Sequence, residues 1–205
     1  MLSFSKGAVV ALVLMACAHS AAAARPAPTT LYDVISQLPE VSKVFAKVEQ
    51  FGLAKQFQNP KLGITAFVPN NDAYDRISKA INNNPSILDN SAIITQALAY
   101  HILNKPLTTE DMPRGVKSYL TALPNQPVAV QFNDKANLFK VGAYNVVERN
   151  IQAGRSVIHV IDGFLVAPSL MPTLVKALRE SKAAAAEAAP AAAAAPAVAA
   201  AVKKP

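Results

Sequence analysis

The chain is poor in cysteine and glycine, and each shortage excludes a class of protein. Its 205 residues contain one Cys and seven Gly. One Cys excludes a scaffold held by internal disulfides and a zinc site built from the cysteines of one chain. The glycines form neither a dinucleotide-binding motif nor a P-loop, so nucleotide-binding enzymes of both kinds are excluded.

Charged residues are also few, at 16% of the chain against roughly 25% in typical soluble domains. The formal net charge is +7, but between Thr29 and Lys182 the 16 Lys and Arg exceed the 12 Asp and Glu by only four. No basic residues are adjacent there, and aromatic residues do not alternate with basic ones. We therefore expect no nucleic-acid partner, while a weak preference for an anionic polysaccharide or lipid surface stays open.

Long hydrophobic runs are missing too, since none reaches the roughly 20 residues of a membrane-spanning helix. Residues 1–24 are instead organised like a secretory signal peptide: Lys6 is the only charge, Ala8–Ala18 is apolar, and an Ala-x-Ala pattern ends at Ala24. An uncleaved signal anchor and a bacterial lipoprotein modified at Cys17 are the alternatives. Cleavage after Ala24 would leave a secreted chain with no cysteine and no stable membrane span.

The remainder of the chain divides into four expected parts. Residues 25–28 are a short linker, and residues 29–170 are one folded domain because no internal repeat is visible. A C-terminal helix over 171–182 leads into an Ala/Pro-rich tail over 183–205, in which 15 of 23 residues are Ala. Such a tail is a spacer with no core of its own, and its end is a poor lipid-anchor signal, so we expect release.

Within the domain, the sequence pattern predicts helices first and strands afterwards. Apolar residues spaced three and four apart predict helices over 31–38, over 41–52, from about Asp72, and over 91–103, with one short strand at 64–68. The second half has six β-prone runs: Val116–Leu120, Val128–Phe132, Leu138–Val141, Asn145–Ile151, Val157–Ile161 and Phe164–Val166. Segregated helices and strands predict an α+β fold.

Two histidines, His101 and His159, are the candidate chemical groups of the domain. Each lies on an apolar face of its predicted helix or strand. They could form a metal site with Asp72 or Asp162, but buried neutral histidines bonded to an oxygen are the more common arrangement. The nearest match to a serine-nucleophile motif, residues 154–158, lacks the final glycine. We therefore expect neither catalysis nor a cofactor, and no metal.

Three segments resemble the motifs of the fasciclin (FAS1) domain family. The first is TAFVPNNDAY at 65–74, the second is the Tyr-His pair at 100–101, and the third is VIHVID at 157–162. Their order and spacing match the family over about residues 29–170. The motif positions that the resemblance marks as structural are Thr65, Phe67, Pro69, Asn71, Asp72, Tyr74, His159 and Asp162.

The resemblance implies an α+β fold in which a β-sandwich-like wedge carries an N-terminal helical lobe. It also makes Tyr100 and His101 binding candidates, because the Tyr-His region is a proposed adhesion determinant in the family. The position of His101 on an apolar stripe opposes a direct contact. One departure, Gly154-Arg155-Ser156 where the family often has Asn-Gly, leaves the turn before the third motif in question.

Two functions follow from the resemblance. The first is a secreted, extracellular or cell-wall adhesion or matrix protein without catalysis, which binds a cell-surface or wall glycan or protein. The Ala/Pro tail is similar to that of fasciclin-like arabinogalactan proteins and fits this function. The second is a soluble carrier, because some single-domain family members bind a carotenoid or a similar lipophilic molecule. A carrier needs an apolar cleft of ligand size. An enzyme or a sensor is the remaining alternative.

Overall fold

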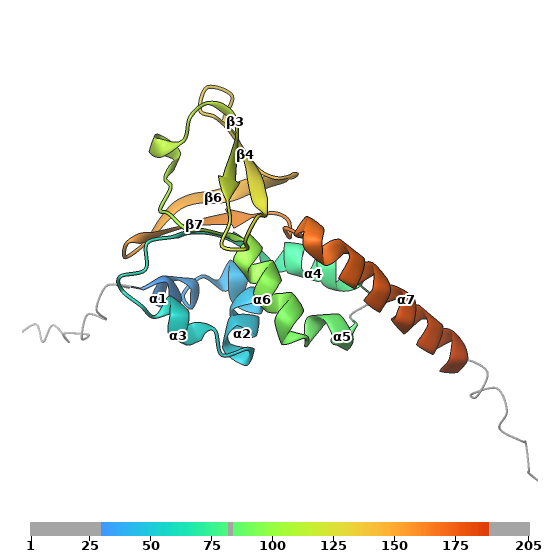
Figure 1. The fold of residues 1–205 in the computed structure, drawn as a ribbon. Helices are drawn as coiled ribbons and strands as arrows, with labels where there is room; N and C mark the ends of the chain where they lie inside the picture. Colours follow the sequence, from blue (N-terminus) through green and yellow to red (C-terminus); the bar gives the residue numbers. More distant parts are fainter. Residues whose placement is uncertain (1–29, 82–83, 189–205) are drawn as a thin grey trace, which may run out of the picture.

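The computed structural model describes residues 30–81 and 84–188, which form a layer of helices, a central sheet and a further part of that sheet folded over it (Figure 1). The α-helices are α1 (Leu31–Ile35), α2 (Ser42–Gln50), α3 (Ala54–Phe57), α4 (Asn71–Ala80), α5 (Pro85–Leu88), α6 (Ser91–Tyr100) and α7 (Met171–Ala188). Single 3-10 turns are η1 (Pro39–Val41), η2 (Thr109–Asp111) and η3 (Pro168–Leu170).

The strands are β1 (Thr65–Pro69), β2 (Ile102–Leu103), β3 (Gly115–Leu120), β4 (Pro127–Asn133), β5 (Leu138–Val141), β6 (Tyr144–Ala153) and β7 (Ser156–Ile161). Their order in the sheet is β2-β1-β7-β6-β5-β4-β3. β1 and β7 pair in parallel, whereas the other neighbouring strands are antiparallel. This mixture of helices and one seven-stranded sheet confirms the predicted α+β class.

The sheet bends back on itself, so that its two end strands meet. Leu103 of β2 bridges Thr121, which directly follows β3, and the Ala122 N–H donates to the Ile102 carbonyl at 2.7 Å. Strands β3, β4 and β5 thereby form an arm, here called the β arm, that stands above β7 in Figure 1. The closed bend produces the wedge that the family resemblance implied.

The central strands β1 and β7 are covered on both faces. Toward the helices, Ala66, Val68, Ile158 and Val160 belong to one hydrophobic core together with side chains of α1 and α2. On the other face, Phe67 and Ile161 belong to a second core with side chains of the β arm and α6. Because both faces are covered, all six residues of β7 are buried, as is usual for a central strand with a parallel neighbour.

Local capping explains where several elements begin and turn. The Thr30 hydroxyl accepts a hydrogen bond from the Asp33 N–H at 3.1 Å, and the Asp33 carboxylate accepts one from the Thr30 N–H at 3.0 Å, a capping box that starts α1. Asn70 caps α4 with a single side-chain hydrogen bond, in which its Oδ1 accepts from the Ala73 N–H at 2.8 Å. Gly154, with φ +60°, opens the two-residue turn that joins β6 to β7, so the turn in question does form.

Two predicted elements were wrong. The helix over 91–103 ends at Tyr100, because Ile102 and Leu103 pair with β1 instead of continuing the helix. Phe164–Val166 is not a strand, because the Leu165 N–H donates to the side chain of His101 rather than to a neighbouring strand.

The ends of the chain are only partly described. The expected signal peptide at 1–24 and linker at 25–28 lie outside the described residues, as does the tail beyond 188. Helix α7 continues to Ala188 and so takes in the first six residues of the expected tail. Among the helices of the described chain, none combines the length and the hydropathy needed to cross a bilayer.

Candidate interaction surface

The side chains of the Tyr-His pair lie in the interior, where they tie α6 to two other segments. His101 is 3% exposed: its Nδ1–H donates to the Ala97 carbonyl at 2.7 Å, and its Nε2 accepts from the Leu165 N–H at 3.0 Å. Burial lowers the pKa of His101 to about 4, so the ring is neutral at pH 7. Tyr100 is 8% exposed and donates to the Pro127 carbonyl at 3.3 Å. Neither side chain is therefore presented to a partner.

His159 is the second buried histidine, and it bonds to the segment between β2 and β3. Its Nε2–H donates to the Leu107 carbonyl at 3.0 Å, and its Nδ1 accepts from the Asn150 N–H at 3.2 Å. Its ring stacks on the ring of Phe67, with 5.7 Å between the ring centroids. It meets the ring of Phe139 edge-on, with 5.0 Å between the centroids. Burial lowers its pKa to about 4 as well.

His101 and His159 are not arranged as a metal site with Asp72 or Asp162. All four ring nitrogens of His101 and His159 are bonded to backbone groups. Asp72 is exposed in the first turn of α4, and Asp162 bonds to Asn145 of β6. In the described part of the chain, no three His, Cys, Asp or Glu side chains are placed to hold a metal ion.

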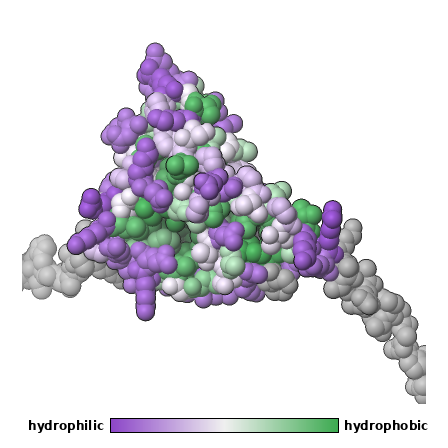
Figure 2. Space-filling model, viewed as in Figure 1, coloured by the Kyte–Doolittle hydropathy of each residue, from purple (hydrophilic) through white to green (hydrophobic). Residues whose placement is uncertain are grey.

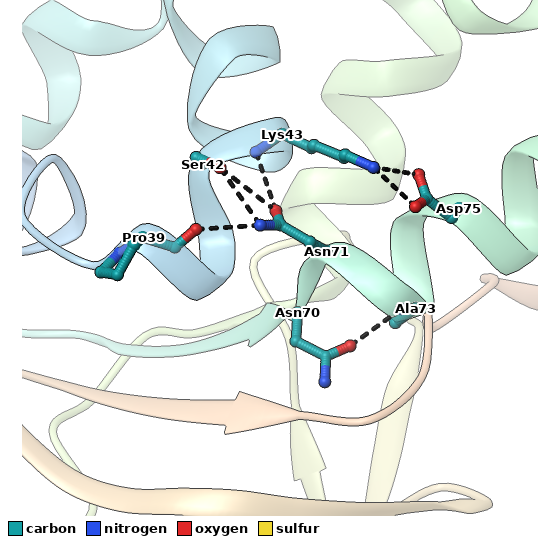
Figure 3. Close-up of polar contacts among 7 residues, drawn as sticks. All are labelled: Pro39, Ser42, Lys43, Asn70, Asn71, Ala73 and Asp75. Atoms are coloured by element: carbon teal, nitrogen blue, oxygen red, sulfur yellow. Dashed lines mark hydrogen bonds and ion pairs between the residues drawn. The ribbon is translucent and has the colours of Figure 1, made fainter.

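Asn71 of the first motif caps a helix other than its own (Figure 3). Its Nδ2 donates to the Pro39 carbonyl at 2.9 Å and to the Ser42 hydroxyl at 3.2 Å, while its Oδ1 accepts from the Lys43 N–H at 3.0 Å. Helix α2 has no side-chain cap from its own N-cap residue. Beside this contact, Lys43 and Asp75 form an ion pair with 2.5 Å between Nζ and Oδ1. Asn71 therefore joins α2 to α4.

Replacing Asn71 with alanine is expected to lower the free energy of unfolding by about 1–2 kcal/mol, the usual effect of losing a helix cap. The backbone N–H of Lys43 and the Pro39 carbonyl would lose their protein partner. Urea unfolding followed by circular dichroism measures the loss. Asn104→Ala, at an exposed position, is the control and should change stability by less than about 0.5 kcal/mol. Equal stabilities of the two variants would contradict the capping role.

Two further motif residues, Thr65 and Asp162, join separate segments through hydrogen bonds. The Thr65 hydroxyl donates to the Lys105 carbonyl at 2.8 Å. The Asp162 carboxylate accepts from the backbone N–H of Asn145 at 2.8 Å and from its Nδ2 at 2.9 Å, which ties the start of β6 to the end of β7. Tyr74 is partly buried beside an apolar cavity. Thr65, Asn71 and Asp162 thus each join two segments of the fold.

The cavity beside Tyr74 has a volume of about 60 Å³ and lies between α2, α4, α5, α6 and the segment from Phe164 to α7. Apart from Lys47 and Tyr74, the side chains that line it are aliphatic or phenyl. Figure 2 shows patches of apolar surface over the helical half, low in the view, whereas the tip above is mostly hydrophilic. The helical half thus combines an apolar interior with apolar surface patches.

One face of the β arm points away from the core and carries exposed apolar side chains. Val116 and Leu120, both on β3, are 68% and 72% exposed. Alternation along the strands places Tyr119, Val128 and Val130 in the core. The opposite side, here called the outer face, consists of Val116, Ser118, Leu120, Pro127, Ala129, Gln131, Asn133, Leu138 and Lys140.

The register brings these outer-face side chains together. Leu120 pairs with Pro127, and Ser118 pairs with Ala129. Gln131 pairs with Val116 on one side and with Lys140 on the other. Lys140 is the one charged member of the outer face as defined, so a partner would meet a nearly neutral surface.

Sequence reasoning marked Tyr100 and His101 and missed the outer face. The predicted strand Val116–Leu120 gave no signal for it: Val116, Ser118 and Leu120 alternate there with Lys117 and Tyr119. Periodicity alone would have placed the apolar Val116 and Leu120 inward. The structure places Tyr119 inward instead, and Lys117 lies over its ring at 5.7 Å.

Comparisons with known proteins agree with this fold. A family model of the fasciclin domain matches residues 39–167, more than half of the chain. Protein sll1483 of Synechocystis sp. is 24% identical over 146 residues, which are 71% of this chain and 78% of that protein. A FAS1 domain pair from the insect cell adhesion molecule fasciclin I matches with a TM-score of 0.55 and 18% identity over 67% of this chain. This chain covers 51% of that pair, about half its length. The chain belongs to the fasciclin domain family.

Proposed function

We propose that the protein is a secreted adhesion or matrix-interaction module, and that its partner binds the outer face of the β arm. Membership of the fasciclin domain family supports an adhesion-type or extracellular role. The observation that carries the proposal is the exposure of Val116 and Leu120 on one face of the same strand, on either side of Ser118. An antiparallel sheet with one face in water normally carries polar residues there, so this exposure favours a binding surface.

The composition of the outer face indicates the kind of partner. A surface with one lysine requires little charge desolvation, and its Ser118 and Gln131 side chains offer neutral hydrogen-bonding groups. A cell-surface or cell-wall glycan or protein with a neutral, partly apolar contact region matches it. Catalysis is not part of the proposal, because the ring nitrogens of both buried histidines are hydrogen-bonded to backbone groups.

The double variant Val116→Ser with Leu120→Ser is expected to weaken binding by tenfold or more, as loss of a central apolar contact does. Stability should change little, since both side chains are exposed. The measurement is the adhesion of protein-coated beads to cells, together with surface plasmon resonance on isolated wall or matrix material. Met171→Ser with Val175→Ser, two apolar residues 50% and 40% exposed on α7, is the matched control. Wild-type binding by the outer-face variant would refute the proposal.

The carrier alternative has the apolar cavity in its favour. Ligand sites usually have volumes of about 300–1,000 Å³, whereas this cavity has about 60 Å³. A carotenoid would fit only after the walls had moved apart. Size exclusion of the protein after incubation with a carotenoid extract separates the two functions. Visible absorbance that elutes with the protein would favour the carrier, and its absence together with wall or matrix binding would favour adhesion.

A further inference from the structure

His101 connects the end of α6 to the segment that walls the apolar cavity. Its Nε2 accepts the hydrogen bond from the Leu165 N–H, and its ring meets the Phe164 ring edge-on at 4.8 Å between centroids. Phe164 and Leu165 both line the cavity, as does Leu174 of α7. The segment follows β7 but pairs with no strand. It is held by the packing of Leu165, Ala167 and Leu170 in the core and by the hydrogen bond from Leu165 to His101.

The chemistry of this contact allows only one protonation state. Because the Ala97 carbonyl can only accept, the ring proton lies on Nδ1, and Nε2 must be unprotonated to accept from Leu165. A second proton would go to Nε2 and would place two donors against each other. Ala97 would keep its hydrogen bond, whereas Leu165 would lose its acceptor.

The surroundings of His101 offer no charge to compensate for protonation. Side chains from α1, α2, α3, β1 and α6 adjoin the same small gap as His101, and they are apolar: Leu31, Ile35, Val48, Phe57, Phe67 and Leu98. On the far side lie Phe164 and Leu165, which are apolar too. The other buried histidine, His159, holds Leu107 and does not line the apolar cavity.

We propose that His101 is an acid-sensitive latch: protonation of Nε2 releases the Phe164–Leu165 segment and opens the wall of the apolar cavity next to α7. Opening lets the imidazolium reach water and exposes the aliphatic lining to a small apolar ligand. The burial that lowers the pKa of His101 to about 4 agrees with a closed state that excludes the proton. The latch does not involve the outer face, so its failure would leave the proposed adhesion function untouched.

Hydrogen exchange of the full chain, measured by mass spectrometry between pH 7 and 4 and corrected for intrinsic rates, tests the latch. Peptides covering 163–172 should lose protection by about tenfold per pH unit between pH 6.5 and 4, and they should exchange faster than β7 throughout that range. His101→Gln should remove this pH dependence, and His159→Gln should retain it. Loss of protection only together with β7, or an unchanged pH dependence in His101→Gln, would overturn the proposal.

A second measurement on the wild-type protein avoids relying on a variant that fails to fold. In a nuclear magnetic resonance titration, the Cε1–H of His101 and the amide of Leu165 should report the same midpoint. Different midpoints would separate the titration from the release of the segment and would overturn the latch.

Discussion

The free energy of unfolding is expected to fall by several kcal/mol when the pH is lowered from 7 to 4. Burial holds the pKa of both His101 and His159 at about 4, against an ordinary value of 6.5. The unfolded chain takes up both protons below about pH 6.5, whereas the folded chain resists them until about pH 4. Stability is therefore full above pH 6.5 and declines down to pH 4, by about 3 kcal/mol for each histidine.

Urea unfolding at pH 7, 5.5 and 4 measures this loss. The variant His159→Gln keeps a donor and an acceptor at the position but cannot titrate, so the slope of stability against pH should fall by about half. Raising the salt concentration should change the slope little, because buried groups are poorly screened. Equal free energies of unfolding at pH 7 and pH 4 would show that the two histidines are not buried as described.

Replacement of Phe67 by alanine is expected to destabilise the domain by about 3–5 kcal/mol, the usual range for a buried phenylalanine. Phe67 is 1% exposed at the centre of β1 and stacks on His159. Its loss would leave a void beside the ring of His159 and the core of the β arm. The structure around it can relax little, because β1 is paired on both sides, with β2 and β7.

Thermal and urea unfolding of Phe67→Ala against the wild-type protein provide the measurement. Phe51→Ala is the matched control, because Phe51 is partly exposed at the end of α2, where it lies near the Lys47 ammonium. The control should cost less than about 1 kcal/mol. A Phe67→Ala variant as stable as Phe51→Ala would contradict the central position of Phe67.

Much of the fold was predictable from local sequence, because the chemistry involved is local. Thr30 and Asn70 cap helices through neighbours three residues away. The runs that became β3, β4, β5 and β7 were recognised from β-branched and aromatic residues. The errors at 102–103 and 164–166 have a different origin, since the partners of those residues lie in distant parts of the chain.

The candidate surface was less predictable than the fold. The family resemblance marked Tyr100 and His101 as binding candidates, and burial of their side chains could not be read from the motif itself. The outer face depends on which side of β3 meets the core. That choice is made by the bend that brings Thr121 to Leu103, which has no signature within the strand. The apolar pattern along one strand therefore cannot predict a surface that depends on contacts between distant segments.

The parallel pairing of β1 with β7 has a consequence for how the chain folds. Thr65 and Val157 are neighbours in the sheet but are 92 residues apart in the sequence. Contacts of such long range slow folding, because the loop between the two strands must close, at a cost in chain entropy, before their pairing stabilises the protein. During synthesis, the central pair cannot form until β7 has left the ribosome. A nascent chain that ends before Ser156 would leave the β7 side of β1 unpaired and would expose its apolar residues to chaperones or to aggregation.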